Sequence, residues 1–131
     1  MQVTTQNNTS TIAQFLQTEF NKYKKSADFV AFKFIQEKTR DYSVRNGKTE
    51  ELTDFIDRGL LVEVMVNGHM GYGATSELTA DGIKYAFNKA FSMTTDASRN
   101  AVYKFDKSIR PSVTGRYSTP RHTKLDQLSL A

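Results

Sequence analysis

Cysteine is absent from this chain of 131 residues, which excludes a disulfide scaffold, a thiolate metal site and a cysteine nucleophile. Long apolar runs are also missing, because no stretch approaches the roughly 20 residues that a membrane-spanning helix needs. The first 10 residues are polar and uncharged, so they do not form a secretory signal peptide. We therefore expect a cytoplasmic, soluble protein that is one domain or a piece of a larger one.

Charge is distributed unevenly along the chain. Residues 1–98 carry a net charge of -1, whereas residues 99–131 carry +5. The basic character therefore belongs to the C-terminal tail, and the body is nearly neutral. Hydrophobic residues make up 38% of the chain and include 9 Phe and 6 Tyr, so a modest core can form.

Two segments have the periodicity of amphipathic helices. The first begins near Ser10 or Thr11, where Thr11 and Gln14 have the spacing of a capping box. The second begins after Thr79, a candidate N-cap, has Leu78 and Ile83 placed as a hydrophobic staple, and ends around residues 92–95. Apolar side chains fall on one face of each helix: Ile12, Phe15, Leu16, Phe20 and Tyr23 in the first, and Ile83, Ala86, Phe87, Ala90 and Phe91 in the second.

The segment between the helices has the signals of an antiparallel sheet. Residues 29–35 alternate in polarity, residues 42–44 continue the pattern, and residues 60–66 read as a central strand. A return strand holds Leu52, Phe55 and Ile56, with a bulge. Asn46-Gly47 and Asn67-Gly68 are each typical of a type I′ turn, and the second leads into a strand over residues 69–74.

These elements predict an α+β fold in which an antiparallel sheet of four to five strands is covered on one face by two main helices. We expect a disordered N-terminus at residues 1–9, the α+β domain at 10–95 and a basic, irregular connector at 96–131. Leu125 to Ala131 resembles the approach to a further helix, with Ser129 as its N-cap, and we expect that helix to lie in a missing C-terminal domain.

The chain has no recognisable catalytic or metal-binding motif. His69 and His122 are far apart in sequence, and neither belongs to a zinc-binding helix motif. We expect His69 to be an exposed turn or strand residue and His122 to be solvated. Glu50 and Glu51 are adjacent, so a strand would place them on opposite sides, as in a solvated hairpin. The sequence therefore assigns no catalytic residue, metal ligand or cofactor site to this chain.

Two features could bind a partner. Tyr72 lies between Gly71 and Gly73, which indicates either close backbone approach or an irregular sheet edge that a peptide could join as an added strand. The tail combines basic and aromatic side chains that could bind single-stranded nucleic acid, although no nucleic-acid-binding motif accompanies them and we do not expect this activity. These tail residues are Arg99, Lys104, Lys107, Arg110, Arg116, Arg121 and Lys124, with Tyr103, Phe105 and Tyr117.

The order and spacing of several short motifs carry a family resemblance. They are Val44-Arg45-Asn46-Gly47-Lys48, Arg58-Gly59, Val62-Glu63-Val64, Gly68-His69-Met70-Gly71-Tyr72-Gly73 and the helix after Thr79. The stretch from about Ala27 to Ser92 resembles the N-terminal domain of the TldD/PmbA family of zinc metallopeptidases, also called modulators of DNA gyrase. Gly115 to Pro120 and Leu125-Asp126 look like the connection into the next segment of that family. Leu61 and Glu63 depart from the pattern, which has Gly and Arg at these places.

The resemblance implies a dimeric enzyme of two domains that acts on flexible peptides in a cavity between subunits. Zinc and the catalytic residues would belong to the missing C-terminal domain, so whether the parent is an active metallopeptidase or its inactive partner stays open. We expect this chain to contribute to homo- or heterodimerisation and to the substrate cavity, without a cofactor of its own and without a membrane. The alternative is a stand-alone binding module, which would use the sheet edge for peptide or the tail for nucleic acid.

Overall fold

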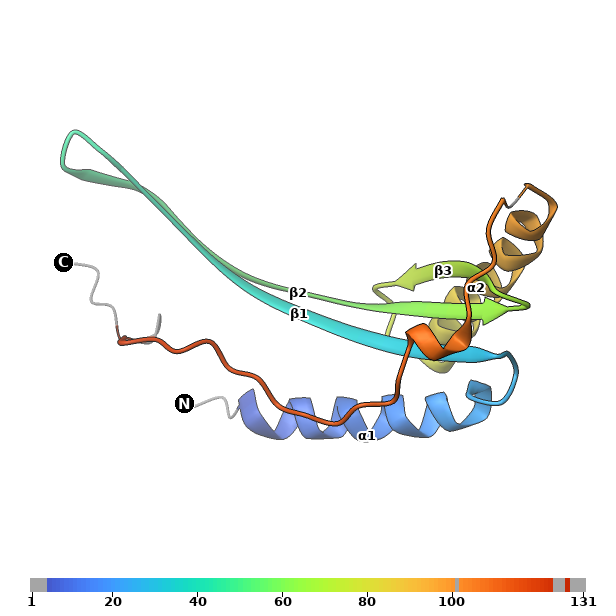
Figure 1. Cartoon of the computed structure of the whole chain (residues 1–131). Helices are drawn as coiled ribbons and strands as arrows, with labels where there is room; N and C mark the ends of the chain where they lie inside the picture. Colours follow the sequence, from blue (N-terminus) through green and yellow to red (C-terminus); the bar gives the residue numbers. More distant parts are fainter. Residues whose placement is uncertain (1–4, 101, 124–126, 128–131) are drawn as a thin grey trace.

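The computed structural model describes residues 5–100, 102–123 and 127 of the chain. In these residues a long helix precedes a sheet, and a second long helix follows it (Figure 1). The elements are α1 (Thr5–Tyr23), β1 (Phe29–Arg45), β2 (Lys48–Val66), β3 (His69–Thr75), α2 (Ala80–Asn100) and a short 3-10 helix, η1 (Lys107–Ile109). The expected α+β class with an antiparallel sheet is therefore confirmed.

The sheet contains three strands in the order β1-β2-β3 within the described part of the chain, so the prediction of four to five strands was wrong. Residues 29–35 and 42–44 belong to one continuous strand, and residues 52–56 join residues 60–66 in another. Both Asn-Gly turns are confirmed, because Asn46, Gly47, Asn67 and Gly68 all have positive φ. A bulge is present as well, but it lies at Glu50, opposite the step from Ser43 to Val44.

The strand count differed because the polar segments that join the predicted strands continue the β1–β2 pairing. Register is unbroken from Phe29↔Met65 to Ser43↔Glu51. At Arg40↔Asp54 the guanidinium donates two hydrogen bonds to the carboxylate, at 3.0 and 2.9 Å. Both faces of this part of the sheet are open to solvent, so its strands do not need apolar alternation to remain paired.

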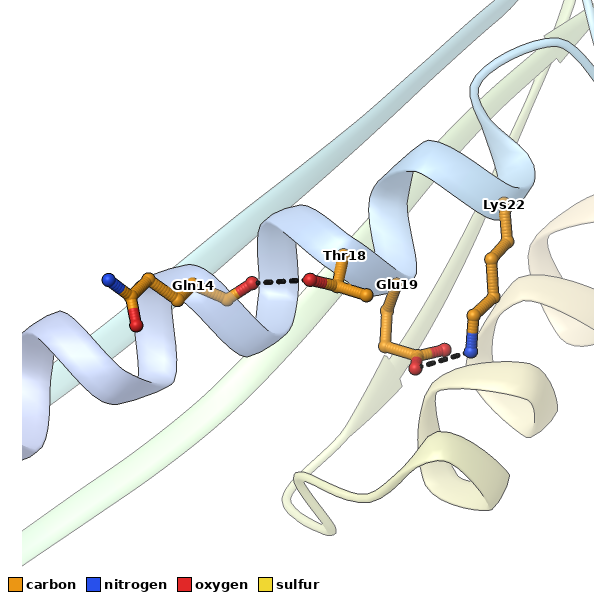
Figure 2. A network of polar contacts seen from close by, with 4 residues as sticks. All are labelled: Gln14, Thr18, Glu19 and Lys22. Atoms are coloured by element: carbon orange, nitrogen blue, oxygen red, sulfur yellow. Dashed lines mark hydrogen bonds and ion pairs between the residues drawn. The ribbon is translucent and has the colours of Figure 1, made fainter.

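Helix α1 begins at Thr5, and residues 5–9, which were predicted as part of a disordered start, lie in it. Their polar sequence has no apolar period to reveal a helix. Further along, Thr18 Oγ1 donates a hydrogen bond to the carbonyl of Gln14 at 3.0 Å, and Lys22 Nζ lies 2.6 Å from Glu19 Oε1 (Figure 2). Glu19 is buried, and the Lys22 ammonium compensates its charge.

Helix α2 begins as predicted, because Thr79 Oγ1 accepts a hydrogen bond from the Gly82 amide at 3.1 Å. It continues to Asn100, beyond the predicted end at 92–95 and across the expected domain boundary at residue 95. Thr94, one turn after Ala90, is polar but buried, so the inward face of α2 is longer than the apolar pattern indicates. Phe91, expected on that face, is instead 38% exposed.

The core lies between one face of the sheet and both helices, as predicted. Side chains from α1, β1, β2 and α2 form a single cluster, and the rings of Tyr23 and Phe87 approach to 4.5 Å between centroids. Its buried members are Leu16, Val30, Leu60, Val62, Val64, Ile83, Ala86, Phe87 and Ala90. Among the described residues, neither α1 nor α2 nor any other helix is apolar over a length sufficient to cross a membrane.

Helix α2 lies directly against the backbone of β3. A Cβ atom placed on Gly73 would lie 2.0 Å from the carbonyl oxygen of Ala86, and one on Gly71 would lie still closer to that of Ala90. The first of the two predicted roles of this glycine pair, close backbone approach, is therefore confirmed. The register of β2 with β3 is continuous from Leu60↔Thr75 to Val66↔His69.

Candidate interaction surfaces

The histidines do not form a metal site in the described part of the chain. His69 begins β3 on the side that α2 covers and is only 6% exposed, so the prediction of an exposed residue was wrong. His122 is exposed in the tail, as predicted. No group of three or more His, Asp or Glu side chains is close enough to hold a metal ion within residues 5–100, 102–123 and 127.

The paired glutamates near the first turn are solvated, as predicted. Glu50 occupies the bulge and lies 3.3 Å from Arg45 Nε, while Glu51 accepts a hydrogen bond from Thr53 Oγ1 at 3.2 Å. Both carboxylates are exposed. Asp54 has a lowered pKa, mainly because Arg40 donates hydrogen bonds to it. The Arg45–Glu50 and Arg40–Asp54 ion pairs connect β1 to β2.

The β1–β2 hairpin extends well beyond the helix-covered sheet as a two-stranded ribbon (Figure 1). We call residues 36–58 the ribbon, since β3 pairs with β2 only over residues 60–66. Large apolar side chains of the ribbon are about half exposed: Val44, Leu52, Phe55 and Ile56. A lone two-stranded hairpin is marginally stable in water, so these side chains are suited to contact another polypeptide.

A groove lies where β3 ends and β2 continues with no strand beside it on that side among the described residues. We call it the notch; it has a volume of about 520 Å3, and its lining includes Ile35, Leu61, Ala74 and Thr75. Glu37 and Asp57 also line it and lie directly opposite one another in the β1–β2 register. The notch therefore combines an apolar floor with two carboxylates and the open edge of β2.

A second groove, of about 440 Å3, lies between β3 and α2. Tyr72, Tyr85 and Met93 line it, and each is more than 40% exposed. β3 is the outer strand of the sheet, so the outward-facing groups of its backbone lie beside this groove. The structure thus places Tyr72, singled out in the sequence, at an accessible sheet edge.

The first part of the basic tail packs on the sheet face opposite to the helices. The Phe105 amide donates to the carbonyl of Gly68 at 2.8 Å, and the Arg110 guanidinium lies 5.9 Å from the ring centre of Phe29. Arg110 also pairs with one carboxylate oxygen of Glu63, and Lys33 pairs with the other. Glu63 is only 7% exposed. Glu63, one of the two departures from the family pattern, therefore holds the tail against the sheet.

The remaining tail residues are distributed among several environments. Arg99 lies in the last turn of α2, Lys107 in η1, and Arg116, Tyr117 and Arg121 in an exposed segment. Tyr103 and Phe105 pack edge to face at 5.3 Å between ring centres. Asp106 caps η1, and the hydrogen bond from the Ser108 amide lowers the pKa of its carboxyl. Lys124, Leu125-Asp126 and the segment from Leu128 to Ala131, which make up most of the predicted approach to a further helix, lie outside the described residues.

Sequence reasoning missed the notch, although a signal for it is present. Glu37 and Asp57 become neighbours only when the β1–β2 register is known, and the Asn46-Gly47 turn between these strands is the sequence signal for that register. However, if cross-strand pairs of β1 and β2 are counted from this turn without allowance for the bulge, every pair beyond the bulge is shifted by one residue. The carboxylates would then be assigned to opposite faces.

Part of the chain matches a known protein family. The family model described as PmbA/TldA metallopeptidase domain 1 matches residues 33–94, which run from β1 to the last part of α2. No curated protein matches the chain. The matched range includes both Asn-Gly turns, the ribbon and the close contact of β3 with α2.

Proposed function

We propose that this chain, whose residues 33–94 match domain 1 of the PmbA/TldA metallopeptidase family, is a non-catalytic part of a peptidase acting on flexible peptides. Its role is to support dimerisation and to border the substrate cavity. Zinc and the catalytic side chains come from another segment or subunit. The assembled enzyme acts in the cytoplasm. The single observation that carries this proposal is the family match over the sheet and α2.

The ribbon supports the dimerisation part of the proposal. Leu52 and Phe55 are 52% and 51% exposed, and they lie on opposite faces of the ribbon. A second TldD/PmbA-type subunit, of the same or a different chain, would cover these side chains. Burying them also stabilises a hairpin that has no core of its own.

The experiment measures metal, activity and mass on the purified chain. We expect no stoichiometric zinc by elemental analysis, no hydrolysis of an unfolded peptide, and a dimer by light scattering. The double variant L52S/F55S should shift the chain towards monomer, whereas V113S, in the tail, should not. One tightly held zinc per chain, or a monomer at every concentration, would contradict the corresponding part of the proposal.

The second candidate function, peptide binding by a stand-alone module, is favoured by the groove beside β3. There, an extended peptide would add a strand to β3 and contact Tyr72 and Met93 of the groove wall. Nucleic-acid binding has less support, because Phe105 and Arg110 of the tail are engaged with the sheet. Titration of the chain with an oligonucleotide at low salt would detect that activity if it were present.

A further inference from the structure

We propose that the notch binds an extended, basic peptide segment, which adds a strand to the free edge of β2 in line with β3. This surface differs from the Tyr72 edge and from the ribbon faces described above. The inference does not depend on the peptidase assignment, because it rests on the geometry of the sheet. A chain that fails to dimerise or to support hydrolysis could still bind such a segment.

The backbone of β2 determines the shape of the occupant. β2 extends from Lys48 to Val66, but β3 pairs with it only from Leu60 onwards, so residues 48–59 have no strand on that side within the described chain. Alternate residues of an unpaired edge direct their N–H and C=O groups outward. The backbone of an extended peptide can form hydrogen bonds with these N–H and C=O groups, as in recognition by strand addition.

The notch also contains an unsatisfied donor. Arg58 Nε is buried and has no hydrogen-bond partner in the described structure. Buried polar atoms in folded proteins are nearly always paired. Because Arg58 Nε is enclosed, a carbonyl oxygen of an added strand reaches it only if the Arg58 side chain turns outward. The open edge of β2 is therefore the observation that indicates a polypeptide.

The charges of the notch determine the chemistry of the occupant. Glu37 and Asp57 are cross-strand neighbours, and like charges in that position oppose strand pairing. The structure gives neither carboxylate an ion-pair partner among the described residues, although Asp57 accepts from the Arg58 amide at 2.8 Å. A lysine or arginine side chain of the added strand would compensate both charges, while Ile35 and Leu61 contact its apolar neighbours.

A second copy of the same edge is a poor occupant. Antiparallel pairing of β2 with its own copy, centred near Thr53, would bring Glu50 of one chain beside Asp57 of the other. Cross-strand carboxylates repel, which is a common protection of sheet edges against self-association. The edge therefore disfavours its own copy and accepts a basic strand.

The test uses the full chain and two labelled short peptides, both with β-branched residues at alternate positions. One peptide carries lysine at the remaining positions, and the other carries glutamate there. We expect the lysine peptide to bind about 3–10-fold more tightly by fluorescence anisotropy, as two solvent-exposed ion pairs allow. Added salt should reduce this preference.

The decisive variant is E37Q/D57N, which removes the repulsive pair and therefore should fold at least as well as the original chain. It should lose the preference for lysine. The matched control D41N/E51Q removes two carboxylates from the same ribbon outside the notch and should keep the preference. Hydrogen exchange provides the second readout: the lysine peptide should protect amides within residues 55–59.

Several results would overturn the proposal. They are failure of both peptides to bind, equal affinity for both, or an unchanged preference in E37Q/D57N. Protection of residues 55–59 in the free chain, lost on removal of residues 111–131, would show that the chain's own tail fills the notch. A dimer that E37Q/D57N alters, without peptide binding, would identify a second copy as the occupant.

Discussion

The two halves of the β1–β2 hairpin are stabilised in different ways. In the half that pairs with β3, Leu60, Val62 and Val64 are fully buried beneath the helices. In the ribbon, the strands remain paired through their backbone, an Arg40–Asp54 contact and a bulge at Glu50, while apolar side chains stay half exposed. The same strands thus contribute to the core in one half and form an exposed ribbon in the other.

This difference predicts which mutations matter, and the largest effect is expected from a matched pair of leucines in β2. Leu60→Ala removes a side chain that is 1% exposed and should lower the free energy of unfolding by about 2–5 kcal/mol. Leu52→Ala, at a site that is 52% exposed, should change it by no more than about 0.5 kcal/mol. Urea unfolding of both variants as monomers measures the contrast. Equal losses would show that the ribbon is part of the cooperative core.

A smaller effect is expected at the contact between β3 and α2. Gly73→Ala places a methyl group 2.0 Å from the Ala86 carbonyl oxygen, so helix and strand must move apart. We expect a loss of about 1–3 kcal/mol, as for other overpacked sites. Gly115→Ala is the control, because nothing lies within 4 Å of the added carbon. Thermal unfolding compares the two, and an unchanged midpoint for Gly73→Ala would contradict the tight approach.

The smallest effect concerns the ribbon alone and depends on pH. Hydrogen bonds from Arg40 lower the pKa of Asp54 in the folded chain. The carboxylate therefore stabilises the ribbon above its unfolded pKa of about 3.9, and this contribution disappears as the pH falls through the lower folded value. Amide exchange of residues 39–41, corrected for intrinsic rates, should become faster on acidification. Asp54→Asn should remove this change, and an identical pH dependence in the variant would refute the assignment.

The parts of the fold that could be predicted are those in which the polarity of each residue matches its burial in the structure. Thr79 and the apolar face from Ile83 to Ala90 identified the start and orientation of α2, and each Asn-Gly pair identified its turn. The helix end was missed because Thr94 is polar and yet buried. The ribbon was divided into short strands because apolar alternation weakens where neither face meets the core. His69 was misplaced for a related reason, since its burial depends on the path of α2.

The interaction surfaces were harder to anticipate. Tyr72 could be placed at an edge from its flanking glycines, whereas the notch requires both the end of β3 and the partnering of Glu37 with Asp57. Arg110 shows the same limit. Its basic side chain suggested an external partner, but Glu63 and Phe29 are reached only when the tail crosses the sheet. Long-range pairing, and not residue type, decides these roles.

The solvent-exposed ribbon has a consequence for how such a domain can vary in evolution. One residue added to each strand beyond Arg40 and Asp54 would lengthen the ribbon by about 3.3 Å. No buried side chain would move, because the core cluster reaches only to Leu60 in β2. The length of the ribbon can therefore change by small insertions while the helix-covered part of the sheet and its core stay the same. Relatives with ribbons of different lengths can share this core.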